Sequence, residues 1–317
     1  MAKYLITGIA GFIGSSLARQ LLSVSDCEIV GIDCFTDYYS RETKERNIRD
    51  IGKSARLHFI EADLNELDLI SLLDGVDGIY HQAGQPGVRK SWGSTFDSYL
   101  DDNVKATQRL LEASRSHPEL KRLVYASSSS IYGDAIEYPT SERSLPSPFS
   151  PYGVTKLAAE NLCSLYAANY GVPTVSLRYF TVYGPRQRPD MAFSKFITSA
   201  IAGQSISIYG DGEQVRDFTY IDDVVGANIA AMESDVLPGS IYNICGGSAC
   251  TVNEVLEIIA NLSANDLEIE YIDRVAGDVR QTGGTNKRAQ RELNWSPKVD
   301  LAAGIATHFE SIARDYR

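Results

Sequence analysis

A tyrosine and a lysine four residues apart, Tyr152 and Lys156, have the spacing most typical of a chemical site in this chain. Residues four apart lie on one face of an α-helix, so the ammonium group would stand beside the phenol. A neighbouring positive charge lowers the pKa of a phenol and makes a tyrosinate usable as a base near neutral pH. A serine cluster at 127–130 ends an earlier apolar run and could share or relay the proton. The pattern predicts proton transfer at a substrate hydroxyl, and the alternative is a tyrosine and a lysine on an exposed helix face.

Three glycines with a regular spacing, Gly8, Gly11 and Gly14, follow the first apolar run. Glycine suits such a position because the chain turns tightly, its backbone approaches a pyrophosphate and the helix packs closely on the strand. The helix N-terminus then offers free N–H groups to the anion. Asp33 ends the next apolar run, where a carboxylate would bind a ribose diol. Together these residues indicate a dinucleotide site, and an ordinary glycine-rich turn is the alternative.

The residues after Asp33 favour NAD over NADP, because Cys34 and Phe35 offer no arginine for a 2′-phosphate. A nicotinamide cation would lower the pKa of Tyr152 further. Asp63 could meet the adenine amino group or cap a helix ahead of Glu66.

The run Gln82, Ala83 and Gly84 would let a cofactor lie across a strand tip, or would form a simple turn.

The elements that must position these residues follow from the hydrophobic periodicity. Short β-rich runs alternate with amphipathic stretches through the first half, which is typical of βαβ units on a parallel sheet. We expect an α/β fold, a doubly wound parallel Rossmann sheet with a second, smaller mixed α/β lobe. The six strands of the sheet are expected at 4–7, 28–32, 57–61, 78–81, 123–127 and 174–179, with helices at 12–23, 104–116 and 152–170.

The texture of the chain changes after about residue 180, where shorter helices and isolated strands are expected, the strands at 205–209, 240–244 and 267–272. We predict an NAD-binding domain at 1–180, together with part of 215–245, and a nucleotide-sugar-binding lobe at 181–317.

The charge balance of the 317 residues excludes some functions. There are 30 Lys and Arg against 41 Asp and Glu, a formal net charge of −11, which argues against a nucleic-acid binder. No apolar stretch approaches the ~20 residues that span a bilayer, and the N-terminus lacks a signal-peptide pattern, so we expect a cytoplasmic protein. Five scattered cysteines and four isolated histidines predict no metal site.

The order of these features resembles the extended short-chain dehydrogenase/reductase superfamily, and within it the NDP-sugar epimerases and dehydratases, over nearly the whole chain. The resemblance implies a catalytic group of Ser128, Tyr152 and Lys156. It implies NAD as the cofactor, bound by Gly8, Gly11, Phe12, Ile13, Gly14, Asp33, Asp63, Leu64, Gln82, Ala83, Gly84, Asn103, Ser127, Tyr152, Lys156 and Tyr179.

The residues at the triad serine separate reaction types within that family. In 4,6-dehydratases the stretch resembles Thr-Asp-Glu, and in UDP-glucuronate decarboxylases it resembles Thr-Ser-Glu. Here it is Ser128, Ser129 and Ser130, without a carboxylate. Elimination chemistry therefore lacks its acid, and the resemblance implies epimerisation.

The run from 178 to 192 looks like that of the UDP-glucuronate 4-epimerases, as do residues 85–92, which include Arg89. Arg188, with Thr181 and the serines 127–129, would then hold the sugar carboxylate, because a guanidinium meets both oxygens. The alternative is a surface loop with structural arginines. The local tally of Arg178, Arg186 and Arg188 against Asp190 suggests a basic pocket.

Further substrate contacts are implied by the same resemblance. Arg216 and Arg280 would bind the diphosphate and Asp278 the nucleoside ribose, while Tyr209 and Phe193 would border the base or belong to the core. The implied substrate set is Arg89, Ser128, Ser129, Tyr152, Thr181, Arg188, Phe193, Tyr209, Arg216, Asp278 and Arg280.

The expected reaction is NAD-dependent C4 epimerisation of UDP-glucuronate to UDP-galacturonate through a 4-keto sugar. The alternatives are a 4-epimerase of a neutral UDP-sugar, such as UDP-glucose or UDP-N-acetylglucosamine, and a non-catalytic NAD-sensing protein of the same fold. A homodimer formed through the helices at 104–116 and 152–170 is a family expectation.

Overall fold

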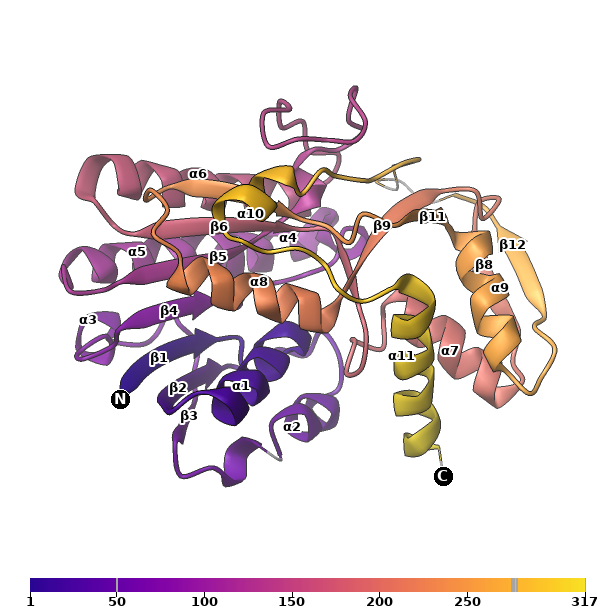
Figure 1. Cartoon of the computed structure of the whole chain (residues 1–317), viewed down its shortest axis with the longest axis horizontal. Coiled ribbons are helices and arrows are strands. Elements are labelled where there is room, and N and C mark those ends of the chain that lie inside the picture. The colour runs from indigo at the N-terminus through magenta and orange to yellow at the C-terminus, as the bar shows by residue number, and fades with distance from the viewer. Residues whose placement is uncertain (50, 275–276, 278, 317) are drawn as a thin grey trace.

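The computed structural model describes residues 1–49, 51–274, 277 and 279–316. Seven parallel strands form the main sheet in the order β10-β6-β5-β4-β1-β2-β3 (Figure 1). This confirms the predicted doubly wound Rossmann sheet. The strands are β1 (Ala2–Thr7), β2 (Cys27–Asp33), β3 (Leu57–Glu61), β4 (Gly78–His81), β5 (Arg122–Ser128), β6 (Thr174–Tyr179) and β10 (Ser240–Ile244).

Helices cover both faces of this sheet (Figure 1). α1 (Phe12–Val24) and α8 (Ile221–Glu233) pack side by side on one face, and α5 (Ala106–Arg115) and α6 (Pro151–Tyr170) on the other. Alternate residues of β1 point to opposite faces, so Ile6 joins the core under α1 and Leu5 the core under α5. α2 (Arg41–Arg49) lies beside α1, and α3 (Leu69–Leu72) lies beside α5.

The helix α6, which carries the predicted catalytic pair, has well-defined ends. Ser150 caps it by accepting a hydrogen bond from the Gly153 N–H at 3.2 Å, and Pro151 occupies its first turn, where a missing N–H costs little. Gly171 ends it in the left-handed conformation with φ +71°. These ends fix which residues face the sheet.

The smaller part of the structure is mixed α/β, as predicted. A three-stranded sheet has the order β11-β9-β7, and a two-stranded sheet pairs β12 with β8. The strands are β7 (Thr181–Tyr183), β8 (Ile206–Tyr209), β9 (Val215–Tyr220), β11 (Ala249–Thr251) and β12 (Ile269–Ile272). The helices are α7 (Ala192–Ala202), α9 (Val252–Leu262), α10 (Lys287–Glu292) and α11 (Leu301–Asp315). β7, β9 and β11 were not predicted.

The prediction of six strands in the main sheet is wrong by one. β10 was expected as an isolated strand, although part of 215–245 was assigned to the NAD domain, and it pairs with β6 from Ser240–Val175 to Ile244–Tyr179. The reason is long-range pairing, which leaves no local signal in the sequence. The division into two domains stays a prediction. Within the described ranges, none of the helices has the length and apolar character needed to cross a bilayer.

Candidate active site

The turn between β1 and α1 packs closely against the neighbouring backbone, which is possible because Gly8 and Gly14 lack side chains. A Cβ at Gly8, whose φ is +68°, would lie 2.7 Å from the Ala83 nitrogen, and a Cβ at Gly14 would lie 2.3 Å from the Gly8 carbonyl oxygen. In the described part of the chain, no side chain caps the start of α1. Its first N–H groups therefore face the adjoining cavity without a side-chain partner, which fits the pyrophosphate of NAD.

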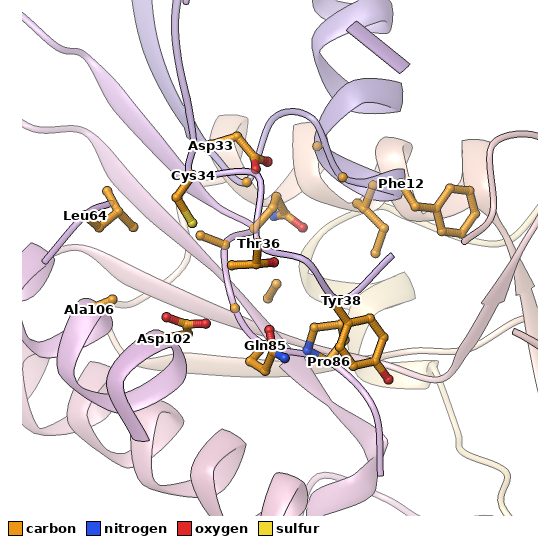
Figure 2. Close-up of a pocket in the computed structure, with 18 of the residues that line it drawn as sticks. Phe12, Asp33, Cys34, Thr36, Tyr38, Leu64, Gln85, Pro86, Asp102 and Ala106 are labelled. Atoms are coloured by element: carbon orange, nitrogen blue, oxygen red, sulfur yellow. The ribbon is translucent and has the colours of Figure 1, made fainter. Parts of the chain in front are cut away.

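A cavity follows the C-terminal ends of the parallel strands from this turn to α6, where ligands of open α/β sheets bind. Figure 2 shows Phe12, Asp33, Leu64 and Asp102 arranged around it. The predicted cofactor residues that line it are Gly8, Gly11, Phe12, Ile13, Gly14, Asp33, Asp63, Leu64, Gln82, Ala83, Gly84, Ser127, Tyr152, Lys156 and Tyr179.

Asp33 stands at the end of β2 as predicted. Its carboxylate accepts hydrogen bonds from the Ala10 N–H at 3.0 Å and the Phe35 N–H at 2.9 Å. Burial raises the pKa of Asp33, and the charge of Lys44 opposes part of that rise. Lys44 comes from α2, lines the same cavity and donates to the Thr36 carbonyl at 2.8 Å. The sequence did not predict Lys44 as a cavity residue, because no local pattern connects α2 with the turn after Asp33.

Asp63 lies in a turn and does not cap a helix. Its Oδ1 accepts from the Asn65 N–H at 2.8 Å, whereas the helix that follows begins at Leu69 and is capped by Asp68. The helix-cap interpretation is therefore wrong, and Asp63 lines the cavity within a turn. Asp102 lies at the same end of the cavity, where burial and the charge of Asp63 raise its pKa to about 6.

Asn103 lies behind the cavity. It is buried, its Oδ1 accepts from the Gln85 N–H at 2.8 Å, and its Nδ2 donates to the Gln85 carbonyl at 3.1 Å and to Thr155 Oγ1 at 3.0 Å. These bonds fix the segment after β4, so Asn103 acts on the cavity wall rather than lining it. The family resemblance had implied a direct contact of Asn103 with NAD.

The structure brings the predicted catalytic residues together. Tyr152 and Lys156 stand one turn apart on α6, and Ser128, at the end of β5, is near enough to lower the pKa of Tyr152. Ser128 Oγ also accepts from the Ser130 N–H at 3.1 Å. Lys156 is buried, with its Nζ 4.7 Å from the centre of the Tyr125 ring. The arrangement can relay a proton between a substrate hydroxyl, Ser128 and Tyr152.

The expected effect of Lys156 on the Tyr152 pKa is not seen. Burial raises the pKa of Tyr152, and the hydrogen bond with Ser128 and the charge of Arg188 offset part of that rise. Burial also lowers the pKa of Lys156 to about 8. Desolvation of a phenol at this depth outweighs a single nearby cation. Among the described residues, Arg188 is the cation whose charge lowers the pKa of Tyr152.

Arg188 lines the cofactor cavity beside Tyr152, and it has a partner that the sequence reasoning did not pair with it. Its Nε and Nη2 each donate to one oxygen of Asp190 at 2.9 Å. Asp190 itself lines a second cavity. The separation of two residues in the sequence was the available signal for this ion pair. In a loop, however, such a separation does not determine whether two side chains point towards each other.

The second cavity lies in the smaller part of the structure and is lined by five predicted substrate residues: Arg89, Thr181, Phe193, Tyr209 and Arg216. The Arg89 guanidinium stacks 4.0 Å from the centre of the Tyr209 ring, which brings the segment after β4 onto the lobe. Phe193 is 2% exposed and packs on Phe218, so it belongs to the hydrophobic core as well as to the cavity wall. Three other predicted residues, Ser128, Ser129 and Arg280, line neither cavity within the described ranges.

The predicted phosphate residues lie on neighbouring segments. Arg216 Nη2 donates to the Val279 carbonyl at 2.7 Å, so the loop that carries Arg280 is adjacent to β9. Arg280 Nη1 donates to Asp211 Oδ1 at 2.7 Å, and its side chain is 46% exposed. Asp278 lies outside the described residues.

Arg178 does not belong to a basic pocket. It is 3% exposed and holds Glu160 by a two-pronged ion pair. Because Arg188 is paired as well, the local charge tally of the sequence overestimated the positive charge offered to a ligand. A count of charged residues overestimates this charge because it does not include the ion pairs that form inside the fold.

A parallel Rossmann sheet with a glycine cradle and a Ser, Tyr, Lys group at its carboxyl edge defines the class, an extended short-chain dehydrogenase/reductase. The model of the NAD dependent epimerase/dehydratase family matches residues 4–245, and the chain belongs to this family.

Similar proteins cover almost the whole chain. A Bacillus subtilis protein named as an uncharacterised UDP-glucose epimerase is 41% identical over 99% of both chains. The UDP-glucuronate 4-epimerase of Thermodesulfobacterium geofontis is 34% identical over 96% of this chain and 94% of its own. The crystal structure of the Bacillus cereus UDP-glucuronic acid 4-epimerase, in complex with UDP-glucuronic acid and NAD, matches with a TM-score of 0.95 and 41% identity, covering 99% of this chain and 100% of that chain.

Proposed function

We propose that this protein interconverts UDP-glucuronate and UDP-galacturonate by epimerisation at C4, with bound NAD. The observation that carries the proposal is the position of Arg188. It lines the same cavity as Tyr152, and its positive charge lowers the pKa of Tyr152. In a uronate the carboxylate is attached to C5, the neighbour of C4. A sugar whose C4 hydroxyl meets Tyr152 therefore brings its carboxylate towards Arg188, a suitable partner. The complex of the Bacillus cereus relative with UDP-glucuronic acid and NAD supports this assignment.

Tyr152 is the base of the proposed reaction. It takes the proton of the C4 hydroxyl, with Ser128 bridging the two oxygens. Lys156, whose pKa is about 8, keeps its charge at neutral pH, and the charge of Arg188 is the one that favours the phenolate of Tyr152. When bound, NAD accepts a hydride from C4 and returns it to the opposite face, so that the cofactor is regenerated in each turnover.

In the proposed mechanism, the second cavity holds the nucleotide while the 4-keto sugar rotates. Arg216 and Arg280 are proposed to neutralise the diphosphate, and Asp278 to bind the ribose. Arg89 and Tyr209, which stack on each other, are proposed to border the base. An anchor at the nucleotide lets the 4-keto sugar expose either face without leaving the protein.

Arg188 has a second proposed task, control of side reactions. The 4-keto uronate is a β-keto acid that loses CO₂ when its breaking C–C bond aligns with the carbonyl π system. A guanidinium that holds the carboxylate near the carbonyl plane keeps this alignment poor. Ser129 and Ser130 follow the triad serine in place of the acid and base that elimination requires.

The second candidate function is a 4-epimerase of a neutral UDP-sugar. The name of the Bacillus subtilis relative favours it, and only the stretch from 181 to 192 separates the two readings. The experiment is to incubate the purified protein with UDP-glucuronate and, separately, with UDP-glucose, and to follow C4 inversion by NMR. The proposal requires faster equilibration of the uronate. A non-catalytic NAD-sensing role would give inversion of neither.

We propose a homodimer formed through α5 and α6, which pack side by side and expose Leu165 and Tyr170 of α6; light scattering tests it. We propose a cytoplasmic location, where NAD and nucleotide sugars are available, to be tested by cell fractionation. We also propose that 1–180 with part of 215–245 forms the NAD domain and 181–317 the sugar lobe, which limited proteolysis tests.

A further inference from the structure

A buried ion pair lies directly behind the cofactor cavity and takes no part in the proposed mechanism. Glu160 of α6 and Arg178 of β6 are 1% and 3% exposed. Arg178 Nη2 donates to Glu160 Oε1 at 2.7 Å, and its Nε donates to Oε2 at 3.0 Å. The remaining nitrogen, Nη1, donates to the Tyr132 hydroxyl at 2.5 Å. Burying two charges is costly, so such a pair is weak evidence for stability and calls for another explanation.

The pair is connected to the cavity through one serine. Ser127 Oγ donates to Glu160 Oε2 at 2.6 Å, and Ser127 lines the cavity with Tyr152 and Lys156. A carboxylate held by a guanidinium has no proton to give, so the serine must be the donor. A hydroxyl has one hydrogen and two lone pairs. Ser127 therefore offers the cavity an acceptor only.

We propose that Glu160, held by Arg178, is a positioning residue that makes Ser127 a hydrogen-bond acceptor towards the cofactor. Ser127 lies at the Tyr152 end of the cavity, where hydride transfer places the nicotinamide. The carboxamide N–H and ribose O–H groups of that half of NAD are the matching donors. A sugar carboxylate has acceptors only, so Ser127 does not bind it. This reverses the expectation that Ser127 shares the carboxylate with Ser129 and Thr181.

The same contact sets the register of the catalytic helix. Tyr152, Lys156 and Glu160 are spaced by four residues on α6 and share one face. Ser127 and Arg178 are paired residues of the neighbouring strands β5 and β6. One carboxylate thus ties the catalytic face of α6 to both strands, next to Ser128.

The first test compares Ser127→Ala with Ser129→Ala. The dissociation constant of NAD is measured by calorimetry on protein freed of cofactor, and the ratio of kcat/KM for UDP-glucuronate and UDP-glucose on the holoenzyme. Ser127→Ala is expected to weaken NAD binding about three- to tenfold, the contribution of one hydrogen bond, and to leave the ratio unchanged. Ser129→Ala is the matched control and is expected to change neither quantity, because Ser129 lines neither cavity within the described ranges. A fall of the ratio in Ser127→Ala, or unchanged NAD binding, would overturn the proposal.

The second test shows whether Glu160 acts through Ser127. The double variant E160Q/R178M removes both buried charges at similar volume, and the amide at position 160 can donate, which frees the hydrogen of Ser127 for the cavity. NAD binding is expected to weaken as in Ser127→Ala, and adding Ser127→Ala to the double variant should change it by less than about twofold. An equal loss from Ser127→Ala in both backgrounds would contradict coupling. Should the double variant not fold, the Ser127→Ala comparison decides alone.

The inference rests on the proposed function only for the identity of the sugar. NAD binding is measured without any sugar, so it tests the polarity of Ser127 even if UDP-glucuronate is not the substrate. Failure of the unaltered protein to invert UDP-glucuronate would refute the proposed function and leave the NAD result standing.

Discussion

Arg188 is held by Asp190 through two parallel hydrogen bonds, Nε to Oδ1 and Nη2 to Oδ2, each 2.9 Å long. Arg188 lines the cofactor cavity and Asp190 the second cavity, so the pair stands where the two meet. A guanidinium has five N–H donors, of which Asp190 takes two. The oxygens of a substrate carboxylate must therefore bind to the three N–H groups that remain. The ion pair fixes the orientation of the Arg188 guanidinium before the sugar binds.

Arg188→Ala is expected to raise KM for UDP-glucuronate by about ten- to a hundredfold, because hydrogen bonds to a charged group are lost. KM for UDP-glucose should change far less, since a neutral sugar has no carboxylate to hold. Steady-state kinetics with both sugars measures the difference. Equal losses would remove the carboxylate contact from the account.

Tyr152→Phe is expected to lower kcat by roughly 10²- to 10⁴-fold, because the general base is removed while the ring remains. NAD should stay bound, as the cavity wall keeps its shape. The matched control is Tyr166→Phe, which removes a hydroxyl from the same helix outside the cavity, where it is hydrogen-bonded to Glu112. Appreciable epimerisation by Tyr152→Phe would exclude a tyrosine base.

Lys156 makes stability depend on pH. Burial lowers its pKa to about 8 from the value of 10.5 expected for the unfolded chain, so between these pH values the unfolded chain binds a proton that the folded chain lacks. The stability of the unaltered protein should therefore rise with pH from about 8 to about 10.5, relative to Lys156→Met, by up to about 3 kcal/mol. Urea unfolding of NAD-free protein at several pH values measures this, and parallel curves would show that the lysine has an ordinary pKa.

Local patterns predicted much of this site. The glycines of the cradle, Asp33 at a strand end, and Tyr152 with Lys156 on one helix face are all set by spacing within a single element and its turn. The structure places each of them around one cavity. Such features need no knowledge of the rest of the fold.

Contacts between distant segments were not predictable in the same way. Lys44 reaches the cavity from α2, and β10 joins the sheet beside β6, although neither has a local signal. The count of local charges overestimated the positive charge of the pocket, because Arg178 forms an ion pair with Glu160. The effect of Lys156 on the Tyr152 pKa was misjudged because burial depth, which decides it, is a property of the packed structure.

Arg178→Met is expected to destabilise the protein by about 3–5 kcal/mol, because it leaves the Glu160 carboxylate buried without its cation. Arg41→Met is the matched control: Arg41 pairs with Glu61 on the surface, where both side chains are about half exposed, and little change is expected. Thermal and urea unfolding compare the two. A small effect of Arg178→Met would mean that water or another donor reaches Glu160.

The role of Arg188 is tested by incubating the purified protein with UDP-glucuronate and following both the epimer and CO₂. We predict equilibration with UDP-galacturonate, faster than any inversion of UDP-glucose under the same conditions, and CO₂ release far slower than epimerisation. Inversion of UDP-glucose alone, or CO₂ release at the rate of epimerisation, would contradict the assignment of Arg188 as the residue that holds and protects the carboxylate.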